Sequence, residues 1–245
     1  MEKNSLSASL EKLQTNNARF EESLWFNGAY LCGIDEVGRG AFVGPVVTAA
    51  VVLYPFSYHQ LLVDSKILPE NKRAEVAFWI MKNSWYSFGM ADHHEIDTLG
   101  IYGATQNAML RAFYGVCMQP GASVIKKVIV DAMPLVLPYN LPYQPTMEAY
   151  NYAETISISV AAASIIAKVK RDQMLSRWGS IYKDYNFESH KGYGTQAHQD
   201  AIALYGPTSV HRKTFIKKFL PGSADDDQYR DKKFEQRHEQ VSIFR

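Results

Sequence analysis

The stretch YLCGIDEVGRG, residues 30–40, is the most informative part of this sequence. Residues 30–35 are mostly apolar and predict a β-strand that ends on Asp35. Glu36 follows directly, and the two glycines after it allow the chain to turn sharply. Neighbouring strand residues point to opposite faces, so both carboxylates serve one site only if the strand ends or twists here. The stretch alone is equally consistent with a solvated acidic turn.

Further elements are predicted on both sides of this stretch. We expect strands at 45–54, 85–91 and 127–130, and helices at 69–83, 101–117, 160–178 and 197–205. Strands come first and then alternate with helices, which indicates one α/β domain with a mixed sheet, followed by helices. Residues 5–25 have apolar side chains at helical spacing and predict a surface helix or arm. Residues 222–245 are charged and predict a solvated tail.

The overall composition limits the classes of function. The chain has 245 residues, 47% of them hydrophobic, and a formal net charge of +1. This balance excludes a uniformly basic nucleic-acid coat, so any anion-binding surface must be local. The polar start predicts no signal peptide, and no apolar run is long enough for a membrane helix. Cys32 and Cys117 lie in apolar stretches, which is typical of reduced thiols in a cytoplasmic protein.

Other carboxylates are candidates for the same chemistry. Asp131 ends the predicted strand at 127–130, a frequent place for a catalytic residue in open α/β sheets; a helix or turn cap is the alternative. Glu154 and Asp172 are further candidates. Clustered carboxylates repel one another unless a cation lies among them, and their hard oxygens suit Mg²⁺ or Mn²⁺.

Basic residues are concentrated in the stretch 164–193. They are Lys168, Lys170, Arg171, Arg177, Lys183 and Lys191. Beside a carboxylate cluster such a stretch fits a polyanion gripped through its backbone, although a solvated helix face is the simpler explanation. The loop HKGYGT, residues 190–195, carries Tyr193, which is suited to stacking on a sugar or base; a buried structural tyrosine is the alternative.

Taken together, these stretches resemble type 2 ribonuclease H, the ribonuclease HII family. The resemblance runs in order from about residue 29 to 216. It is carried by GIDEVGRG (33–40), GPVV (44–47), DSK (64–66), VD (130–131), AAASIIAKV (161–169), RD (171–172), HKGYGTQAH (190–198), GP (206–207) and HR (211–212).

The resemblance implies an α/β, ribonuclease H-like fold: a mixed five-stranded sheet flanked by helices, with a small helical C-terminal part. The implied organisation is an N-terminal helical arm at 1–28, a catalytic domain at 29–220 and a charged flexible tail at 221–245. The implied activity is endonucleolytic cleavage of RNA in RNA–DNA hybrids and 5′ of single ribonucleotides embedded in duplex DNA. Such an enzyme leaves 5′-phosphate and 3′-hydroxyl ends and acts in ribonucleotide and primer removal.

The resemblance also implies the catalytic and metal-binding residues. Asp35, Glu36 and Asp131 match the family's carboxylates, and two divalent ions, Mn²⁺ or Mg²⁺, would activate the attacking water and stabilise the leaving 3′ oxygen. Glu154 occupies the fourth position, where the family usually has Asp. A glutamate is more typical of ribonuclease HIII, but the Gly-Arg-Gly and His-Lys-Gly-Tyr-Gly-Thr motifs favour type 2.

Substrate contacts follow from the same motifs. Gly38, Arg39 and Gly40 would sense the ribose 2′-hydroxyl, which distinguishes RNA from DNA, and Tyr193 would pack on the adjacent sugar. The candidate phosphate contacts are Lys66, Lys168, Arg171 and Lys191. For Asp172 we expect a structural ion pair, and for His190, His198 and His211 structural or supporting roles.

The C-terminus offers one further partner. Gln240, Ile243 and Phe244 lie in the peptide QVSIF, which resembles the short motif by which bacterial replication proteins hold the sliding clamp. A short motif after a solvated linker is a plausible docking device; chance apolar residues at a chain end are the alternative. Otherwise we expect a monomer that does not bind membranes.

Two other functions remain open from the sequence. One is a ribonuclease HIII-like preference for longer hybrids, and the other is a nucleic-acid-binding protein that does not cut. A metal-binding protein with no nucleic-acid role leaves the basic stretch and the Gly-Tyr loop unexplained.

Overall fold

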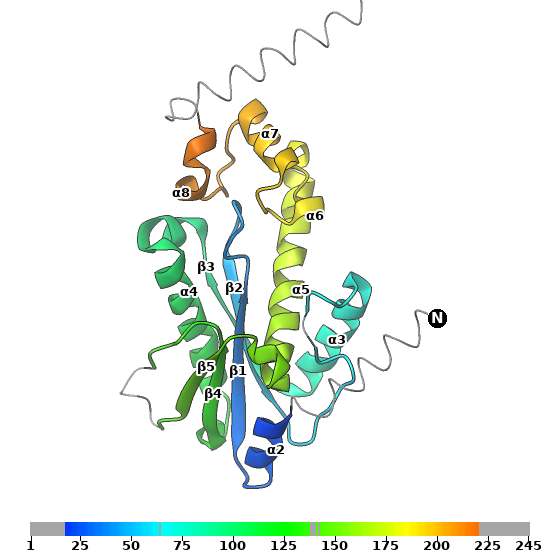
Figure 1. Cartoon of the computed structure of the whole chain (residues 1–245), viewed down its shortest axis with the longest axis vertical. Coiled ribbons are helices and arrows are strands. Elements are labelled where there is room, and N and C mark those ends of the chain that lie inside the picture. Colours follow the sequence, from blue (N-terminus) through cyan, green and yellow to red (C-terminus); the bar gives the residue numbers. More distant parts are fainter. Residues whose placement is uncertain (1–17, 64, 138–140, 142, 221–245) are drawn as a thin grey trace, which may run out of the picture. The chain divides into compact units, whose positions relative to one another are not determined.

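A five-stranded mixed sheet forms the centre of the fold. The computed structural model describes residues 18–63, 65–137, 141 and 143–220 (Figure 1). The strands, in sheet order, are β3 (Ser84–Ala91), β2 (Val46–Leu53), β1 (Tyr30–Val37), β4 (Ile125–Asp131) and β5 (Thr146–Tyr150). β3, β2 and β1 pair antiparallel, whereas β1, β4 and β5 are parallel. This arrangement confirms the predicted fold class.

The described helices fall into two compact units. The helices are α2 (Arg19–Trp25), α3 (Glu70–Lys82), α4 (His93–Cys117), α5 (Ile158–Ile181), α6 (Phe187–His190), α7 (Gln196–Tyr205) and α8 (Lys213–Ile216). The first unit contains the sheet, α2 to α4 and α5 up to Met174. The second contains Gly40–Gly44 and the chain from Leu175 onward, with the short C-terminal helices. None of the described helices is long and apolar enough to cross a membrane.

In the first unit, helices cover both faces of the sheet (Figure 1). Strand alternation sends Cys32 and Ile34 of β1 into a core with α4, while Leu31 packs with Val160 of α5. Gly33 lies directly beneath the start of α5, where a β-carbon would collide with the Ser159 backbone. The face of β1 that carries residues 31, 33 and 35 is therefore the face covered by α5.

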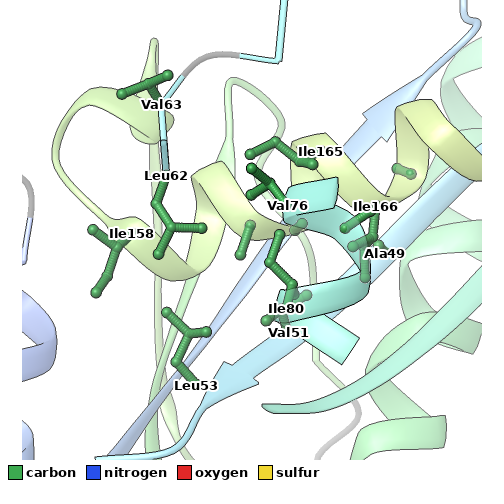
Figure 2. Packing of buried hydrophobic residues seen from close by; sticks show 14 of the residues in the cluster. Ala49, Val51, Leu53, Leu62, Val63, Val76, Ile80, Ile158, Ile165 and Ile166 are labelled. Atoms are coloured by element: carbon green, nitrogen blue, oxygen red, sulfur yellow. The ribbon is translucent and has the colours of Figure 1, made fainter. Parts of the chain in front are cut away.

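Branched apolar side chains fill the core between the sheet, α3 and α5. Figure 2 shows Ala49 and Val51 of β2 packed with Val76 and Ile80 of α3 and Ile165 of α5. All five are fully buried. Burying each large aliphatic side chain contributes roughly 1.5–3 kcal/mol, so this layer holds α5 firmly against the sheet.

Two elements differ from the sequence expectation. Strand β5 lies in a stretch whose side chains are mostly half-exposed, so no apolar pattern marks it. Helix α4 begins at His93, ahead of the expected residue 101, because Asp92 caps it by accepting a hydrogen bond from the Glu95 N–H at 2.8 Å. Gly100, with φ of 72°, breaks the helix between these two starts.

The N-terminal helical arm at 1–28 stays a prediction. The described part of this stretch contains α2, whereas residues 1–17 and the tail at 221–245 lie outside the described residues. Glu21 of α2 is fully buried, and its Oε1 accepts hydrogen bonds from Ser157 Oγ at 2.6 Å and Ser159 N at 2.9 Å. It thereby satisfies a backbone donor in the first turn of α5.

We expect Glu21→Ala to lower the free energy of unfolding by about 2 kcal/mol, because it removes a helix cap and leaves buried donors unpaired. Urea unfolding at neutral pH measures the change. Glu75→Ala is the control, since its exposed ion pair with Lys72 is worth less than about 1 kcal/mol. Equal effects of the two variants would show that Glu21 does not stabilise α5.

Candidate active site

Two carboxylates lie at the C-terminal ends of adjacent parallel strands. The register of β1 and β4 pairs Ile34 with Val130, so the next residues, Asp35 and Asp131, are neighbours across the sheet. Ile34 and Val130 pack into the core with α4. By alternation the two aspartates therefore face the side of the sheet that α5 covers.

The charges of three carboxylates act on one another. Burial, followed by the negative charge of Glu36 and then that of Asp131, raises the pKa of Asp35 well above its usual value. Burial also raises the pKa of Glu36, with a further increase from Asp131, and Arg39 opposes this rise. Asp35 is 7% exposed and the Glu36 side chain 12%, which excludes the interpretation of residues 35 and 36 as a solvated turn.

Hydrogen bonds hold both aspartates in place. Asp35 Oδ1 accepts from the Glu36 N–H at 2.7 Å. Asp131 Oδ1 accepts from the Ala153 N–H at 2.9 Å. Because Ala153 begins a 3₁₀ turn, Ala153–Thr155, Asp131 also fixes the chain next to Glu154.

Glu154, the predicted fourth carboxylate, lies in this turn and is 7% exposed. Its backbone is brought close to Asp131, although its role as a ligand stays a prediction. Among the residues that the structure describes, no three His, Cys, Asp or Glu side chains are grouped closely enough to hold a metal ion.

The donor chemistry nevertheless fits a divalent cation. Glu36 Oε2 is buried and has no hydrogen-bond partner within the described part of the chain. The other oxygen, Oε1, pairs with Arg39 Nη1 at 3.4 Å, and a bound cation would give the buried Oε2 a partner. Carboxylate oxygens are the ligands that Mg²⁺ and Mn²⁺ prefer.

The glycine turn after β1 lies against a buried arginine. Gly38 has φ of 91°, and a β-carbon there would collide with the Arg171 guanidinium. Arg171 is fully buried, and its Nε donates to the Pro45 carbonyl at 3.2 Å. The expected phosphate contact by Arg171 is therefore wrong for this conformation, since the side chain supports the turn from inside the protein. Sequence alone marks such a residue only as a positive charge.

The other predicted phosphate contacts have different surroundings. Lys66 is exposed and Lys191 is half-buried. Lys168 Nζ lies 2.8 Å from Asp172 Oδ1, and Arg73 lies 3.9 Å from the same carboxylate. These contacts agree with the structural ion pair expected for Asp172.

In the second unit, Gly40–Gly44 runs beside the loop that carries Tyr193. Isolated β-bridges pair Ala41 with Tyr193 and Val43 with His211. The Phe42 N–H donates to the Gly192 carbonyl at 2.8 Å. The segment that begins at Gly40 is thus joined to the predicted sugar-binding tyrosine, whose side chain stays partly exposed.

A chain of histidine hydrogen bonds supports this tyrosine loop. The Thr208 N–H donates to His211 Nδ1 at 2.9 Å, so the proton of His211 is on Nε2. That Nε2 lies 3.1 Å from His198 Nε2, which must accept, leaving His198 Nδ1 to donate to the Tyr193 carbonyl at 2.9 Å. Both rings are neutral, and their roles are structural, as expected.

His190 belongs to the same cluster. Its ring stacks on that of His198 with 4.4 Å between centroids. Its Nδ1 accepts from the Gly192 N–H and its Nε2 donates to the Tyr185 carbonyl at 2.7 Å. It too is a structural residue.

Sequence reasoning did not single out Ser65, Ser164 or Arg73. Ser65 and Ser164 lie within the quoted motifs, but a serine carries no charge that would mark it. The predicted clamp-binding residues, Gln240, Ile243 and Phe244, lie outside the described residues.

The histidine chain predicts a pH-dependent stability. Burial lowers the pKa of His198 from 6.5 to about 4. Between these values the unfolded chain binds a proton that the folded chain does not, so stability is complete above the unfolded pKa and falls as the pH decreases. We expect this residue to account for a loss of about 2 kcal/mol between about pH 7.5 and about pH 5, measured by urea unfolding.

His198→Asn removes the titrating ring, so its stability should depend less steeply on pH in this range. His94→Asn is the control for loss of an exposed histidine. An unchanged slope in His198→Asn would contradict the assignment of neutral rings.

Solved structures with a similar fold include ribonucleases named H2, HII and HIII. Ribonuclease H2 from Pyrococcus horikoshii OT3 superposes with a TM-score of 0.64 at 23% identity, over 82% of this chain and 99% of that one. The ribonuclease HII in the PCNA:RNase HII complex from Archaeoglobus fulgidus gives 0.61 at 23% identity, over 80% and 99%. Bst-RNase HIII in complex with Mn²⁺ gives 0.57 at 18% identity, over 82% and 64%. At these identities the likeness shows the fold alone.

Two curated relatives have a higher sequence identity to this chain than these solved structures do. Ribonuclease HII of Caldanaerobacter subterraneus subsp. tengcongensis is 39% identical over 206 residues, which cover 83% of this chain and 81% of that protein. Ribonuclease HII of Bacillus licheniformis is 40% identical over 212 residues, covering 86% and 78%. The family described as Ribonuclease HII matches residues 32–218. The chain therefore belongs to the ribonuclease HII family.

Proposed function

We propose that this chain is an endonuclease that cuts the RNA strand of RNA–DNA hybrids and cuts 5′ of single ribonucleotides embedded in duplex DNA. The observation that carries the proposal is the placement of Asp35 and Asp131 at the adjoining ends of β1 and β4, with Glu36 directly after Asp35; the raised pKa values of Asp35 and Glu36 agree with it. A bound divalent ion would offset the mutual repulsion of these carboxylates, and phosphodiester hydrolysis is a reaction that cations at carboxylate sites promote.

Asp35, Glu36, Asp131 and Glu154 would hold Mn²⁺ or Mg²⁺. When bound, two such ions supply activation of the attacking water and stabilisation of the leaving 3′ oxygen. The water oxygen forms the new bond to phosphorus, and the bond to the 3′ oxygen breaks, leaving 5′-phosphate and 3′-hydroxyl ends. The protein's part is to keep the carboxylates together, through the pairing of β1 with β4 and the hydrogen bonds from Glu36 N and Ala153 N.

Recognition of the ribose is assigned to the glycine turn and the tyrosine loop. Gly38, Arg39 and Gly40 would present backbone groups to the 2′-hydroxyl, because glycine permits a close approach. Tyr193 would pack on the neighbouring sugar, and Lys66, Lys168 and Lys191 would contact phosphates. We place this activity in ribonucleotide removal and primer removal in the cytoplasm, carried out by a monomer.

Asp131→Asn tests the proposal. The asparagine oxygen can still accept from the Ala153 N–H, so the fold should persist while the second oxygen is replaced by an amide that repels a cation. We expect the cleavage rate on duplex DNA containing one ribonucleotide to fall by at least about 100-fold with Mn²⁺ or Mg²⁺, with an unchanged melting temperature. Full activity in this variant would remove Asp131 from the site.

The choice of substrate separates this proposal from its alternatives. We expect the wild-type protein to cut a duplex with one ribonucleotide as readily as one with a run of four. Cleavage of the longer run only would indicate a ribonuclease HIII-like preference, in keeping with the glutamate at position 154. Binding of the hybrid without any cleavage would indicate a non-catalytic role.

Clamp binding by the C-terminal peptide is a second proposed interaction. It is favoured by the QVSIF motif at 240–244 and by the similar ribonuclease HII solved in complex with PCNA. We expect deletion of residues 240–244 to abolish co-purification with the bacterial sliding clamp and to leave cleavage of naked substrate unchanged. Equal clamp binding by the deleted and full-length chains would refute the interaction.

A further inference from the structure

Phe42 joins two parts of the second unit that are far apart in the sequence. It is the central residue of the segment Gly40–Gly44. Its N–H donates to the Gly192 carbonyl at 2.8 Å, and its carbonyl accepts from the Arg212 N–H at 2.8 Å. The backbone of the segment is therefore held on one side by the tyrosine loop and on the other by the chain before α8.

The Phe42 ring supports the tyrosine loop as well. A β-carbon on Gly194 would collide with three atoms of this ring, so the backbone of the loop lies directly on it. The ring also contacts the rings of His198 and Phe219, with 5.7 and 5.5 Å between centroids. Phe42 thus fills the space between the loop, α7 and the turn at Lys217–Phe219.

Helix α7 holds the same loop through polar contacts. His198 Nδ1 donates to the Tyr193 carbonyl at 2.9 Å, and Gln199 Nε2 donates to the Gly194 carbonyl at 2.9 Å. The backbone on both sides of the Tyr193 side chain is thereby fixed, while the residue itself stays 36% exposed. Apolar support from Phe42 and hydrogen bonds from α7 together give this exposed ring a defined base.

The spacing between the two ends of this arrangement matters for recognition. Gly40, two residues before Phe42, belongs to the turn assigned to the ribose 2′-hydroxyl, and Tyr193 is assigned to the neighbouring sugar. Two groups can contact adjacent sugars at once only if the distance between them is fixed, because a small misplacement of a contact group loses much of its effect. Phe42 is bonded to the tyrosine loop through its backbone and packed against it through its ring.

We propose that Phe42 is a positioning residue for substrate recognition: it fixes the tyrosine loop against the segment that begins at Gly40, so that Gly40 and Tyr193 contact adjacent sugars of one strand. This inference rests on the proposed function, in which the turn and the tyrosine recognise a ribonucleotide.

The experiment measures kcat and KM of the full-length protein on duplex DNA containing one ribonucleotide. Packing on a sugar is present in the bound substrate and in the transition state alike, so its loss raises KM and leaves kcat unchanged. We expect Tyr193→Ala to raise KM about 10-fold and Phe42→Ala about 5-fold. Phe42→Leu, which keeps most of the apolar volume, should stay within about 2-fold of the wild type.

Two double variants show whether Phe42 acts through the loop. KM of Phe42→Ala combined with Tyr193→Ala should equal that of Tyr193→Ala alone, because a base has no effect once its ring is gone. Gly194→Ala places a methyl group against the Phe42 ring and should raise KM by itself. It should add nothing to Phe42→Ala, in which the ring that it strikes is absent.

Phe20→Ala is the matched control. Phe20 is a half-buried phenylalanine of α2 in the first unit, and its ring lies 6.1 Å from that of Tyr150. It should lower the melting temperature as Phe42→Ala does and leave KM unchanged. A wild-type KM in Phe42→Ala, or a KM in its combination with Tyr193→Ala that is the product of the two single effects, would overturn the proposal.

The same measurements separate this proposal from the function on which it rests. If the wild type cuts and Tyr193→Ala raises KM while Phe42→Ala does not, only the role of Phe42 fails. If the wild type does not cut the duplex with one ribonucleotide, the proposed function itself fails.

Discussion

The parallel pairing of β1 with β4 is the constraint on which the candidate site depends. Because Ile34 is paired with Val130, the residues that follow lie side by side on the face covered by α5. A slip of one residue would move Asp131 to the face covered by α4. The apolar residues of both strands prevent that slip, since each has a buried place in one of the two cores. Hydrophobic patterning thus fixes the position of charged groups.

Holding like charges together works against folding. The raised pKa values of Asp35 and Glu36 are the sign of that cost, and the rest of the first unit must supply the compensating stability. A ligand that binds only the folded form stabilises it, so bound divalent ions would both relieve the repulsion and stabilise the protein. Strain of this kind is common where a fold serves chemistry.

Much of this arrangement could be predicted from the sequence. Asp35 and Asp131 each end an apolar strand, and that pattern alone indicates a shared sheet edge. Strand β5 could not be found in this way, because its half-exposed side chains show no apolar pattern. The burial of Arg171 could not be predicted either. A lysine or arginine in a basic stretch indicates an exposed side chain, and only the packing beneath Gly38 shows that this one is buried. The hydrogen bond between Ser65 and Ser164 joins residues 99 positions apart, a pairing that no local pattern contains.

The histidine cluster of the second unit has a consequence for metal selectivity. Three imidazoles in close contact resemble a site for zinc or nickel, which bind through a ring nitrogen lone pair. Here each such lone pair already accepts a hydrogen bond: His211 from the Thr208 N–H, His198 from His211, and His190 from the Gly192 N–H. A soft transition metal would have to break these bonds to coordinate. These hydrogen bonds therefore disfavour coordination of such a metal by the tyrosine loop.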